Sequence, residues 1–280
     1  MLTREVDMVT EEKSQGAAAT SGPAVRLEAH DGIGYIKINK PKANLYDRTF
    51  ITELNDAVDE IRFNDGIKVV IVLSELEKFF SAGADINMLK TSEPNFKSSF
   101  CLGAQETLGK IERTPKVFLA ALNGHTVGGG LEIAMAMDLR FAADTPGLQI
   151  GLPEVKLGVL PGTGGTQRLS RLIGKSRALD LMITGRLLTA QEALDYGIVN
   201  YIYPADQLLE KVEEYASQIV NGATRAVGLI KQAVVQGTEV HLDAGFFMER
   251  ELQNRLFISE DAKEGIAAWT ERRTPEFHGR

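Results

Sequence analysis

Two glutamates stand beside glycine-rich turns, in positions suited to proton transfer. Glu132 directly follows Gly128-Gly129-Gly130, and Glu154 ends the segment Gly151-Leu152-Pro153-Glu154. Carboxyl groups there can accept and donate protons, while backbone N–H groups left free at a glycine turn can polarise a carbonyl oxygen. We therefore expect acid–base chemistry on a carbonyl compound.

The residues around Glu132 indicate a buried helix. The helix surface is apolar on nearly all sides, because Leu131 and the run Ile133-Ala134-Met135-Ala136-Met137 surround Glu132 in the sequence. Burying an unpaired carboxylate is costly or raises its pKa, and such groups are frequent where protons are transferred. The alternative is that Glu132 occupies one polar stripe and faces water, and the sequence leaves this open.

Two glycine turns are candidates for an oxyanion hole. The triple glycine lies between a predicted strand at 117–122 and a helix that begins near Leu131. A helix start leaves N–H groups free, and consecutive glycines let another molecule approach the backbone closely. An earlier turn, Ser81-Ala82-Gly83-Ala84-Asp85, could supply the second N–H donor. Either turn alone is also explained by a chain reversal without a ligand.

Strands and helices alternate in the elements that must position these turns. Alternating hydrophobicity around Asp31-Gly32 predicts a hairpin, and buried apolar runs and helical spacing follow it. The predicted elements are strands at 25–28, 34–38, 68–73 and 117–122 and helices at 50–61 and 102–111. A capping box of Thr189 and Glu192 opens one more short helix, which Gly197 closes. This alternation predicts an α/β fold.

The chain divides into three predicted parts. Residues 1–24 are polar and then rich in small residues, so we expect a disordered tail. Residues 25–205 form the α/β core with the catalytic site. Residues 206–280 are mostly helical, and apolar residues such as Phe247 and Trp269 either pack on their own domain or form a subunit interface.

Composition narrows the function classes. The chain has 280 residues, 44% of them hydrophobic and 25% charged, which is enough to form a sizeable core. A net charge of -7 disfavours nucleic acid as a partner, and no apolar run approaches the roughly 20 residues that cross a membrane. Cys101 is the only cysteine, which excludes an intrachain disulfide and fits a cytoplasmic location.

Motifs for nucleotide and metal binding are incomplete. Gly162-Thr163-Gly164-Gly165 resembles a phosphate cradle and Gly174-Lys175-Ser176 the end of a P-loop, but Leu169 stands where a Walker motif requires glycine. No dinucleotide fingerprint follows a strand, no serine sits in a G-x-S-x-G elbow, and the histidines lack metal-ligand spacing. We expect no metal and no separate cofactor.

Four motifs, in order along the chain, resemble the crotonase superfamily and specifically its enoyl-CoA hydratases. They are Phe80 to Ile86, Asn123-Gly124 with Gly128 to Glu132, Gly151 to Glu154, and Leu157-Gly158 with Pro161 to Leu169. The likeness covers roughly Val25 to the C-terminus. Four linked motifs are far more specific than any one of them.

The resemblance implies a crotonase-like fold of repeated β-β-α units, with a C-terminal helical region used for trimer assembly and commonly a hexamer of two trimers. It implies an acyl-CoA thioester as the substrate, with coenzyme A as part of it. The N–H groups of Ala84 and Gly129 match the family's oxyanion hole, and Glu132 and Glu154 match its catalytic glutamates.

The resemblance also implies contacts with coenzyme A. The residues expected to bind it or the acyl chain are Ala82, Gly83, Asp85, Ile86 and Lys42. The segment from Lys40 to Asp47 departs from the family's Pro-x-x-Asn-Ala-Leu region and is shifted or shortened, so the contact of Lys42 is the least constrained of these expectations.

The expected reaction adds water across the 2,3 double bond of a trans-2-enoyl-CoA and gives a 3-hydroxyacyl-CoA. Two N–H donors polarise the thioester, Glu132 deprotonates the water that attacks C3, and Glu154 supplies the proton to C2. The alternatives are another acyl-CoA enzyme of the superfamily, such as an isomerase, hydrolase or dehydratase, and a noncatalytic or RNA-binding relative. The acidic charge speaks against RNA.

Overall fold

A computed structural model describes residues 22–280, so nearly all of the predicted tail at 1–24 lies outside the described residues. The core is a six-stranded sheet of order β1-β2-β3-β5-β7-β9. Its strands are β1 (Val25–His30), β2 (Ile33–Ile38), β3 (Val69–Ser74), β5 (Val117–Leu122), β7 (Leu139–Asp144) and β9 (Tyr201–Pro204). All neighbours are parallel except β1 and β2.

The predicted hairpin is confirmed. Strands β1 and β2 pair antiparallel from Val25 opposite Ile38 to His30 opposite Ile33. Asp31 and Gly32 both have positive φ, 52° and 79°, which suits the tight turn between twisted strands.

A second, smaller sheet of three parallel strands has the order β4-β6-β8. Its members are β4 (Phe79–Ser81), β6 (His125–Val127) and β8 (Ile150–Gly151). Each follows a strand of the main sheet and leads toward a helix, which confirms the repeated β-β-α units that the family resemblance implies. Hydrophobic patterning had indicated only turns here, because two or three residues are too few to show a period of two.

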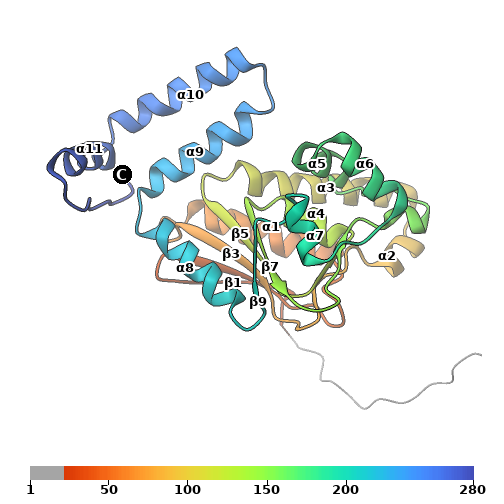
Figure 1. Ribbon diagram of the computed structural model, residues 1–280. Coiled ribbons are helices and arrows are strands. Elements are labelled where there is room, and N and C mark those ends of the chain that lie inside the picture. Colours follow the sequence, from red (N-terminus) through yellow and green to blue (C-terminus); the bar gives the residue numbers. More distant parts are fainter. Residues whose placement is uncertain (1–21) are drawn as a thin grey trace, which may run out of the picture.

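Helices surround the two sheets (Figure 1). They are α1 (Arg48–Phe63), α2 (Ile86–Thr91), α3 (Pro94–Arg113), α4 (Gly129–Met135), α5 (Gly165–Ile173), α6 (Lys175–Thr184), α7 (Ala190–Asp195) and α8 (Leu208–Val220), with the 3₁₀ helix η1 (Glu154–Leu157). Helices α1 and α3 pack together, and α8 packs on β3, β5 and β7.

Two helix boundaries differ from the prediction. The predicted helix at 102–111 is the second half of α3, which begins at Pro94, a residue well suited to a first helical turn. Helix α4 begins at Gly129, within the triple glycine rather than near Leu131. The capping box at α7 is confirmed, since Thr189 and Glu192 each accept the other's backbone N–H.

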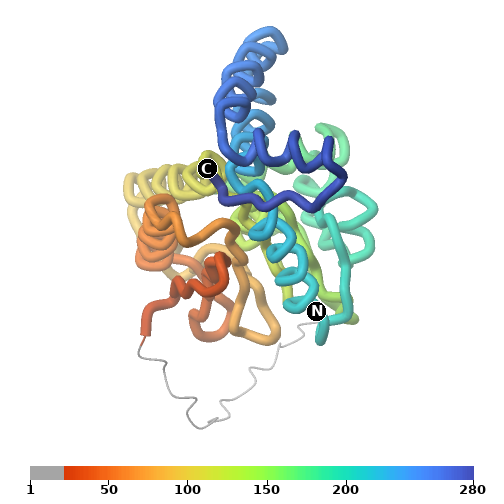
Figure 2. Tube along the Cα trace, turned by 90° about the vertical axis from the view of Figure 1, so that its left-hand side faces the viewer, coloured from red at the N-terminus to blue at the C-terminus, as the bar shows by residue number. Residues whose placement is uncertain are grey.

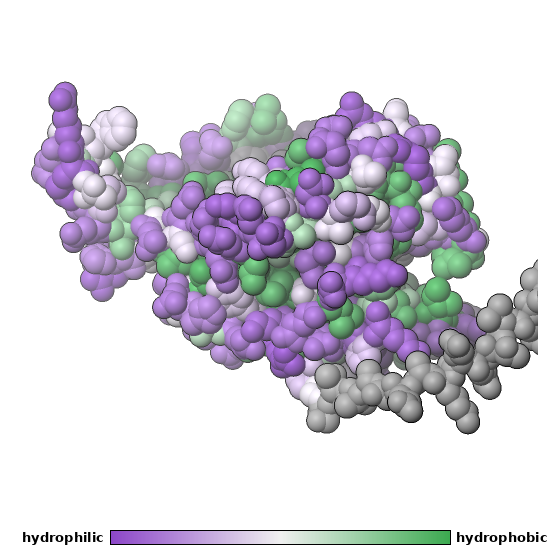
Figure 3. Space-filling view, turned by 60° about the horizontal axis from the view of Figure 1, so that its bottom comes forward, coloured by the Kyte–Doolittle hydropathy of each residue, from purple (hydrophilic) through white to green (hydrophobic). Residues whose placement is uncertain are grey.

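The C-terminal helical region is present and projects from the core. Helices α9 (Thr224–Gly237) and α10 (Leu242–Phe257) lie side by side as a hairpin that extends away from the body, and α11 (Glu260–Glu271) lies near their base (Figures 1 and 2). No helix between residues 22 and 280 is long and apolar enough to cross a bilayer. On the face shown in Figure 3, hydrophobic side chains form small patches among hydrophilic ones.

Candidate active site

The small sheet positions the predicted site. The chain leaves β4 toward Gly83 and Ala84, leaves β6 toward Gly128 and Gly129, and leaves β8 toward Glu154. Because these strands are parallel neighbours, their carboxyl ends meet at one edge, where ligands of parallel sheets commonly bind.

The two predicted oxyanion turns are in close contact. Gly83 and Gly128 have φ of +94° and +58°, in the left-handed region that favours glycine. A Cβ on Gly83 would lie 2.9 Å from the backbone nitrogen of Gly129, so only glycine allows this approach. In the part of the chain that the structure describes, the N–H groups of Ala84 and Gly129 make no hydrogen bond. They are therefore available to a ligand.

Glu132 lies in the first turn of α4 and is only 2% exposed, so the alternative that it faces water is wrong. Its Oε1 accepts the backbone N–H groups of Thr163 and Gly165, both at 2.7 Å. Burial raises the pKa of this carboxyl, and the two N–H donors and the charge of Arg168 oppose the rise by favouring the ionised form.

The loop that holds Glu132 is the segment that first resembled a phosphate cradle. In Gly162-Thr163-Gly164-Gly165 two backbone N–H groups, those of Thr163 and Gly165, donate to a carboxylate of the protein itself. A Cβ on Gly165 would lie 2.7 Å from Pro161 and 3.0 Å from Glu132 Oε1, so this glycine leaves room for the hydrogen bond. The motif thus orients a candidate catalytic group.

Glu154 opens η1 and is half-buried. Its Oε1 faces the glycine turn, since a Cβ on Gly128 would lie 3.3 Å from it. Its Oε2 is buried and has no hydrogen-bond partner among residues 22–280. Burial raises the pKa of Glu154 to about 7; its own backbone N–H opposes this rise and the nearby charge of Glu132 adds to it.

This arrangement can perform coupled acid–base chemistry. The glutamates influence each other's charge, so their protons titrate as a pair rather than independently. Glu154 faces the turn that carries the Gly129 N–H, and Glu132 lies in the first turn of the helix that begins at Gly129, near the donors that would stabilise a developing oxyanion. One bound molecule could therefore contact all four groups.

The structure places the other predicted ligand residues around the same turn. Ala82 donates its N–H to Ala43 at 3.0 Å, which brings the exposed Lys42 to this side of the site. The Asp85 carboxylate caps α2 by accepting two of its N–H groups, while Ile86 is 55% exposed. Ala82, Asp85 and Ile86 thus flank Gly83, with the Asp85 side chain engaged in a structural cap.

Two side chains to which the sequence assigned no role complete the site. The hydroxyls of Tyr46 and Thr163 form a buried hydrogen bond of 2.9 Å. Tyr46 lies against Gly129, where a Cβ would overlap its ring. The signals in the sequence were the irregular segment from Lys40 to Asp47, which contains Tyr46, and the glycine motif that contains Thr163.

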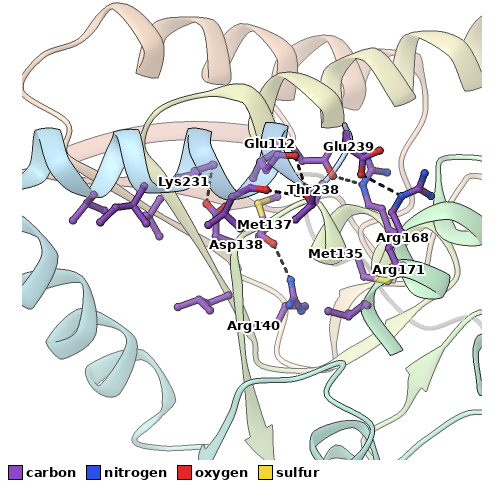
Figure 4. A pocket seen from close by; sticks show the side chains of 18 of the residues that line it. Glu112, Met135, Met137, Asp138, Arg140, Arg168, Arg171, Lys231, Thr238 and Glu239 are labelled. Atoms are coloured by element: carbon purple, nitrogen blue, oxygen red, sulfur yellow. Dashed lines mark hydrogen bonds and ion pairs between the residues drawn. The ribbon is translucent and has the colours of Figure 1, made fainter. Parts of the chain in front are cut away.

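A cavity of about 730 Å³ lies elsewhere, between α9 and the core (Figure 4). Its charged side chains point mostly at one another, as in the pairs Arg168 with Glu112 at 2.6 Å and Lys231 with Asp138 at 2.8 Å. Neither Glu132 nor Glu154 lines it. The pairing indicates a structural role for these charges.

Comparison with known proteins identifies the family. A family model described as enoyl-CoA hydratase/isomerase matches residues 28–280. A probable enoyl-CoA hydratase of Mycobacterium tuberculosis is 38% identical, and the match covers 90% of this chain and 97% of that protein. A short-chain-enoyl-CoA hydratase of Clostridium acetobutylicum is 36% identical, and the match covers 90% of this chain and 96% of that protein. A crystal structure of an enoyl-CoA hydratase from Geobacillus kaustophilus superposes with a TM-score of 0.91 at 54% identity. The match covers 93% of this chain and 98% of that one. The resemblance seen in the sequence is confirmed, and the chain belongs to the enoyl-CoA hydratase/isomerase family of the crotonase superfamily.

Proposed function

We propose that this protein is an enoyl-CoA hydratase that converts a trans-2-enoyl-CoA and water to a 3-hydroxyacyl-CoA. The observation that carries the proposal is that Glu154 faces the glycine turn beside the unpaired N–H groups of Ala84 and Gly129, and that Glu132 lies in the first turn of the helix which begins there. The relatives named above support it, and a further one, named crotonyl-CoA hydratase, is 34% identical.

In the proposed mechanism the thioester oxygen accepts hydrogen bonds from the N–H groups of Ala84 and Gly129. Glu132 takes a proton from water as the water oxygen bonds to C3, and the electrons of the double bond move toward the thioester oxygen. Glu154 then gives its proton to C2, and the enolate returns to a thioester. Before the next turnover, the proton that Glu132 has gained passes through solvent to Glu154.

The substrate contacts form a second part of the proposal. Ala82, Gly83, Asp85 and Ile86 neighbour Ala84 in the chain, and in this proposal their backbone contacts the thioester and pantetheine. The exposed ammonium of Lys42 offers a positive charge to the coenzyme A phosphates. Coenzyme A enters as part of the substrate, and no separate cofactor is needed for the proton transfers.

The test is hydration of crotonyl-CoA, followed by the loss of ultraviolet absorbance of the conjugated thioester. Glu132→Gln and Glu154→Gln should each lower kcat by about 10² to 10⁴, because each removes one proton transfer. Glu210→Gln, at an exposed position on α8, is the matched control and should keep full activity. A folded Glu132→Gln or Glu154→Gln variant with most of its activity would contradict the proposal.

The family description also includes isomerases, so the position of the double bond must be followed. An isomerase would move the double bond of a 3-enoyl-CoA without adding oxygen from water. Turnover in isotope-labelled water, with mass analysis of products from thioesters of graded length and branching, separates the two reactions and measures chain-length preference.

We propose further that the chain assembles as a homo-oligomer, a trimer or a hexamer of two trimers. Helices α9 to α11 expose large apolar side chains, among them Leu242, Phe247 and Trp269, the last 87% exposed. Such surfaces mark protein contacts. Light scattering should show more than one subunit, and Phe247→Glu should shift the assembly toward monomer; a monomeric parent protein would refute this part. A cytoplasmic role in fatty acid metabolism stays a prediction.

A further inference from the structure

Tyr46 lies beside the predicted oxyanion turn and is hydrogen-bonded to its backbone. Its side chain is 2% exposed, and its backbone pairs with that of Ala84 as a parallel bridge. The Tyr46 N–H donates to the Gly83 carbonyl at 2.9 Å, and the Asp85 N–H donates to the Tyr46 carbonyl at 3.0 Å. The position of this tyrosine is therefore linked to that of a predicted oxyanion donor.

The ring has little freedom. It stacks on Phe100 with 5.8 Å between centroids and lies tilted against Phe50 at 6.4 Å. On another side it touches Gly129, whose missing Cβ leaves the space that the hydroxyl and ring edge occupy. Three neighbours thus aim the hydroxyl in one direction.

That direction is toward the loop that holds Glu132. The Tyr46 hydroxyl lies 2.9 Å from Thr163 Oγ1, and both side chains are buried. The N–H groups of Thr163 and Gly165 donate to Glu132 Oε1. A buried hydroxyl that loses its hydrogen-bond partner destabilises the arrangement that buries it. Removing either hydroxyl should therefore loosen this loop.

Other contacts also anchor the loop, but from different parts of the fold. Gln105 donates to the Gly162 carbonyl at 2.8 Å, and Arg168 donates to the Thr163 carbonyl at 3.0 Å while it pairs with Glu112. Of these three anchors, Tyr46 alone joins the loop to the segment that pairs with Ala84.

We propose that Tyr46 is a positioning residue of this active site: through its hydrogen bond to Thr163 it fixes the loop whose N–H groups hold the Glu132 carboxylate beside the oxyanion hole. The inference rests on the proposed hydratase function for its kinetic consequence. Its structural consequence, a change in the pKa of the Glu132 carboxyl, can be measured without turnover.

The groups that act on Glu132 come from several elements. Burial raises its pKa, while the N–H groups of Gly165 and Thr163, the Arg168 guanidinium on α5 and the Thr163 hydroxyl lower it. Glu154 on η1 and Cys101 on α3 are the other titratable groups near it, besides Tyr46 itself. Loosening the loop weakens the stabilising donors and leaves the burial unchanged, so the Glu132 pKa should rise.

The experiment compares Tyr46→Phe, Thr163→Val and the double variant with the parent protein. Tyr46→Phe keeps the ring and its stacking and removes only the hydroxyl. Tyr35→Phe is the matched control, because it removes a tyrosine hydroxyl that donates to Glu213 at 3.1 Å, between β2 and α8. Thr163→Ser, which keeps a hydroxyl, should retain the parent behaviour.

The kinetic readout is the pH profile of kcat/KM for crotonyl-CoA. We expect Tyr46→Phe to lower kcat about tenfold with little change in KM, and to move the acidic limb to higher pH. The double variant should be no worse than the more impaired single variant, because both remove the same hydrogen bond. The direct readout is carbon NMR of isotope-labelled glutamate carboxyls, with the Glu132 signal assigned by its loss in Glu132→Gln.

A Glu132 carboxyl that titrates identically in the parent protein and in Tyr46→Phe would overturn the inference, as would losses that multiply in the double variant. A shift equally large in Tyr35→Phe would also overturn it, since the effect would then be general. If the parent protein hydrates none of the enoyl-CoA thioesters of graded length, the proposed function fails, while the NMR titration still decides the role of Tyr46.

Discussion

Replacing Glu154 by glutamine should lower the hydration rate by about 10² to 10⁴ and, at alkaline pH, stabilise the fold. Burial raises the pKa of Glu154 from an ordinary 4.5 to about 7. Between these two pH values the folded state keeps a proton that the unfolded state releases, so the contribution of Glu154 to stability falls as pH rises from 4.5 to about 7. Glutamine cannot ionise and does not carry this cost.

The size of the effect follows from the shift. A rise from 4.5 to about 7 corresponds to at most roughly 3.4 kcal/mol, at about 1.36 kcal/mol per pH unit. Because Glu154 is only half-buried, solvent screening reduces this to about 1–2 kcal/mol. For a chain of this size the Tm of Glu154→Gln should rise by about 2–8 °C at alkaline pH.

The assay is thermal unfolding of the parent protein and Glu154→Gln at about pH 8 and at about pH 4.5, with crotonyl-CoA hydration measured on the same samples. The gain in Tm should be present at the higher pH and nearly absent at the lower one. Glu210→Gln, exposed on α8, should change neither Tm nor activity. A gain that is absent at alkaline pH, or equal at both pH values, would refute the reasoning that burial keeps this carboxyl protonated.

Three further predictions concern other parts of the molecule. The pH profile of kcat/KM should be bell-shaped, rising as the base of the glutamate pair loses its proton and falling near pH 7 as the acid loses its own; a profile flat through neutral pH would contradict it. Gly129→Ala should lose most activity, because the new Cβ would overlap Tyr46, while Gly103→Ala, with open space around its Cα, should keep it in the same assay. Lys231→Met should lower the free energy of unfolding in urea by about 3–5 kcal/mol by leaving the half-buried Asp138 carboxylate without its cationic partner, and Asp138→Asn should restore part of this loss.

The long elements of the fold could be predicted because their own residues encode them. Strand β3 is a continuous apolar run, and α1 buries residues at helical spacing, including Phe50, Leu54 and Ile61. The small sheet could not be predicted from such patterns, since β8 has only two residues and exists through pairing with β6. Its strands are nonetheless what bring the three parts of the site together.

The candidate site likewise contains residues that could be predicted from the sequence and residues that could not. The glutamates could be found because a carboxylate in an apolar helix and a pair of glycine turns are unusual in themselves. Tyr46 and Thr163 could not, because a contact between hydroxyls 117 residues apart leaves no local pattern. The loop at 162–165 was visible as a glycine motif, but its partner, a carboxylate 31 residues earlier, was not.

The surroundings of the two glutamates differ in a way that bears on their proposed roles. Glu132 Oε1 accepts two backbone N–H groups, and donors of this kind stabilise a carboxylate more than a carboxylic acid. Glu154 has a buried Oε2 with no partner among the described residues, which favours the neutral form. When the pair holds one proton, these contacts therefore favour an ionised Glu132 and a protonated Glu154. A carboxylate is what deprotonation of water requires and a carboxylic acid is what protonation of C2 requires, so unequal hydrogen bonding of two identical side chains is enough to assign them opposite tasks.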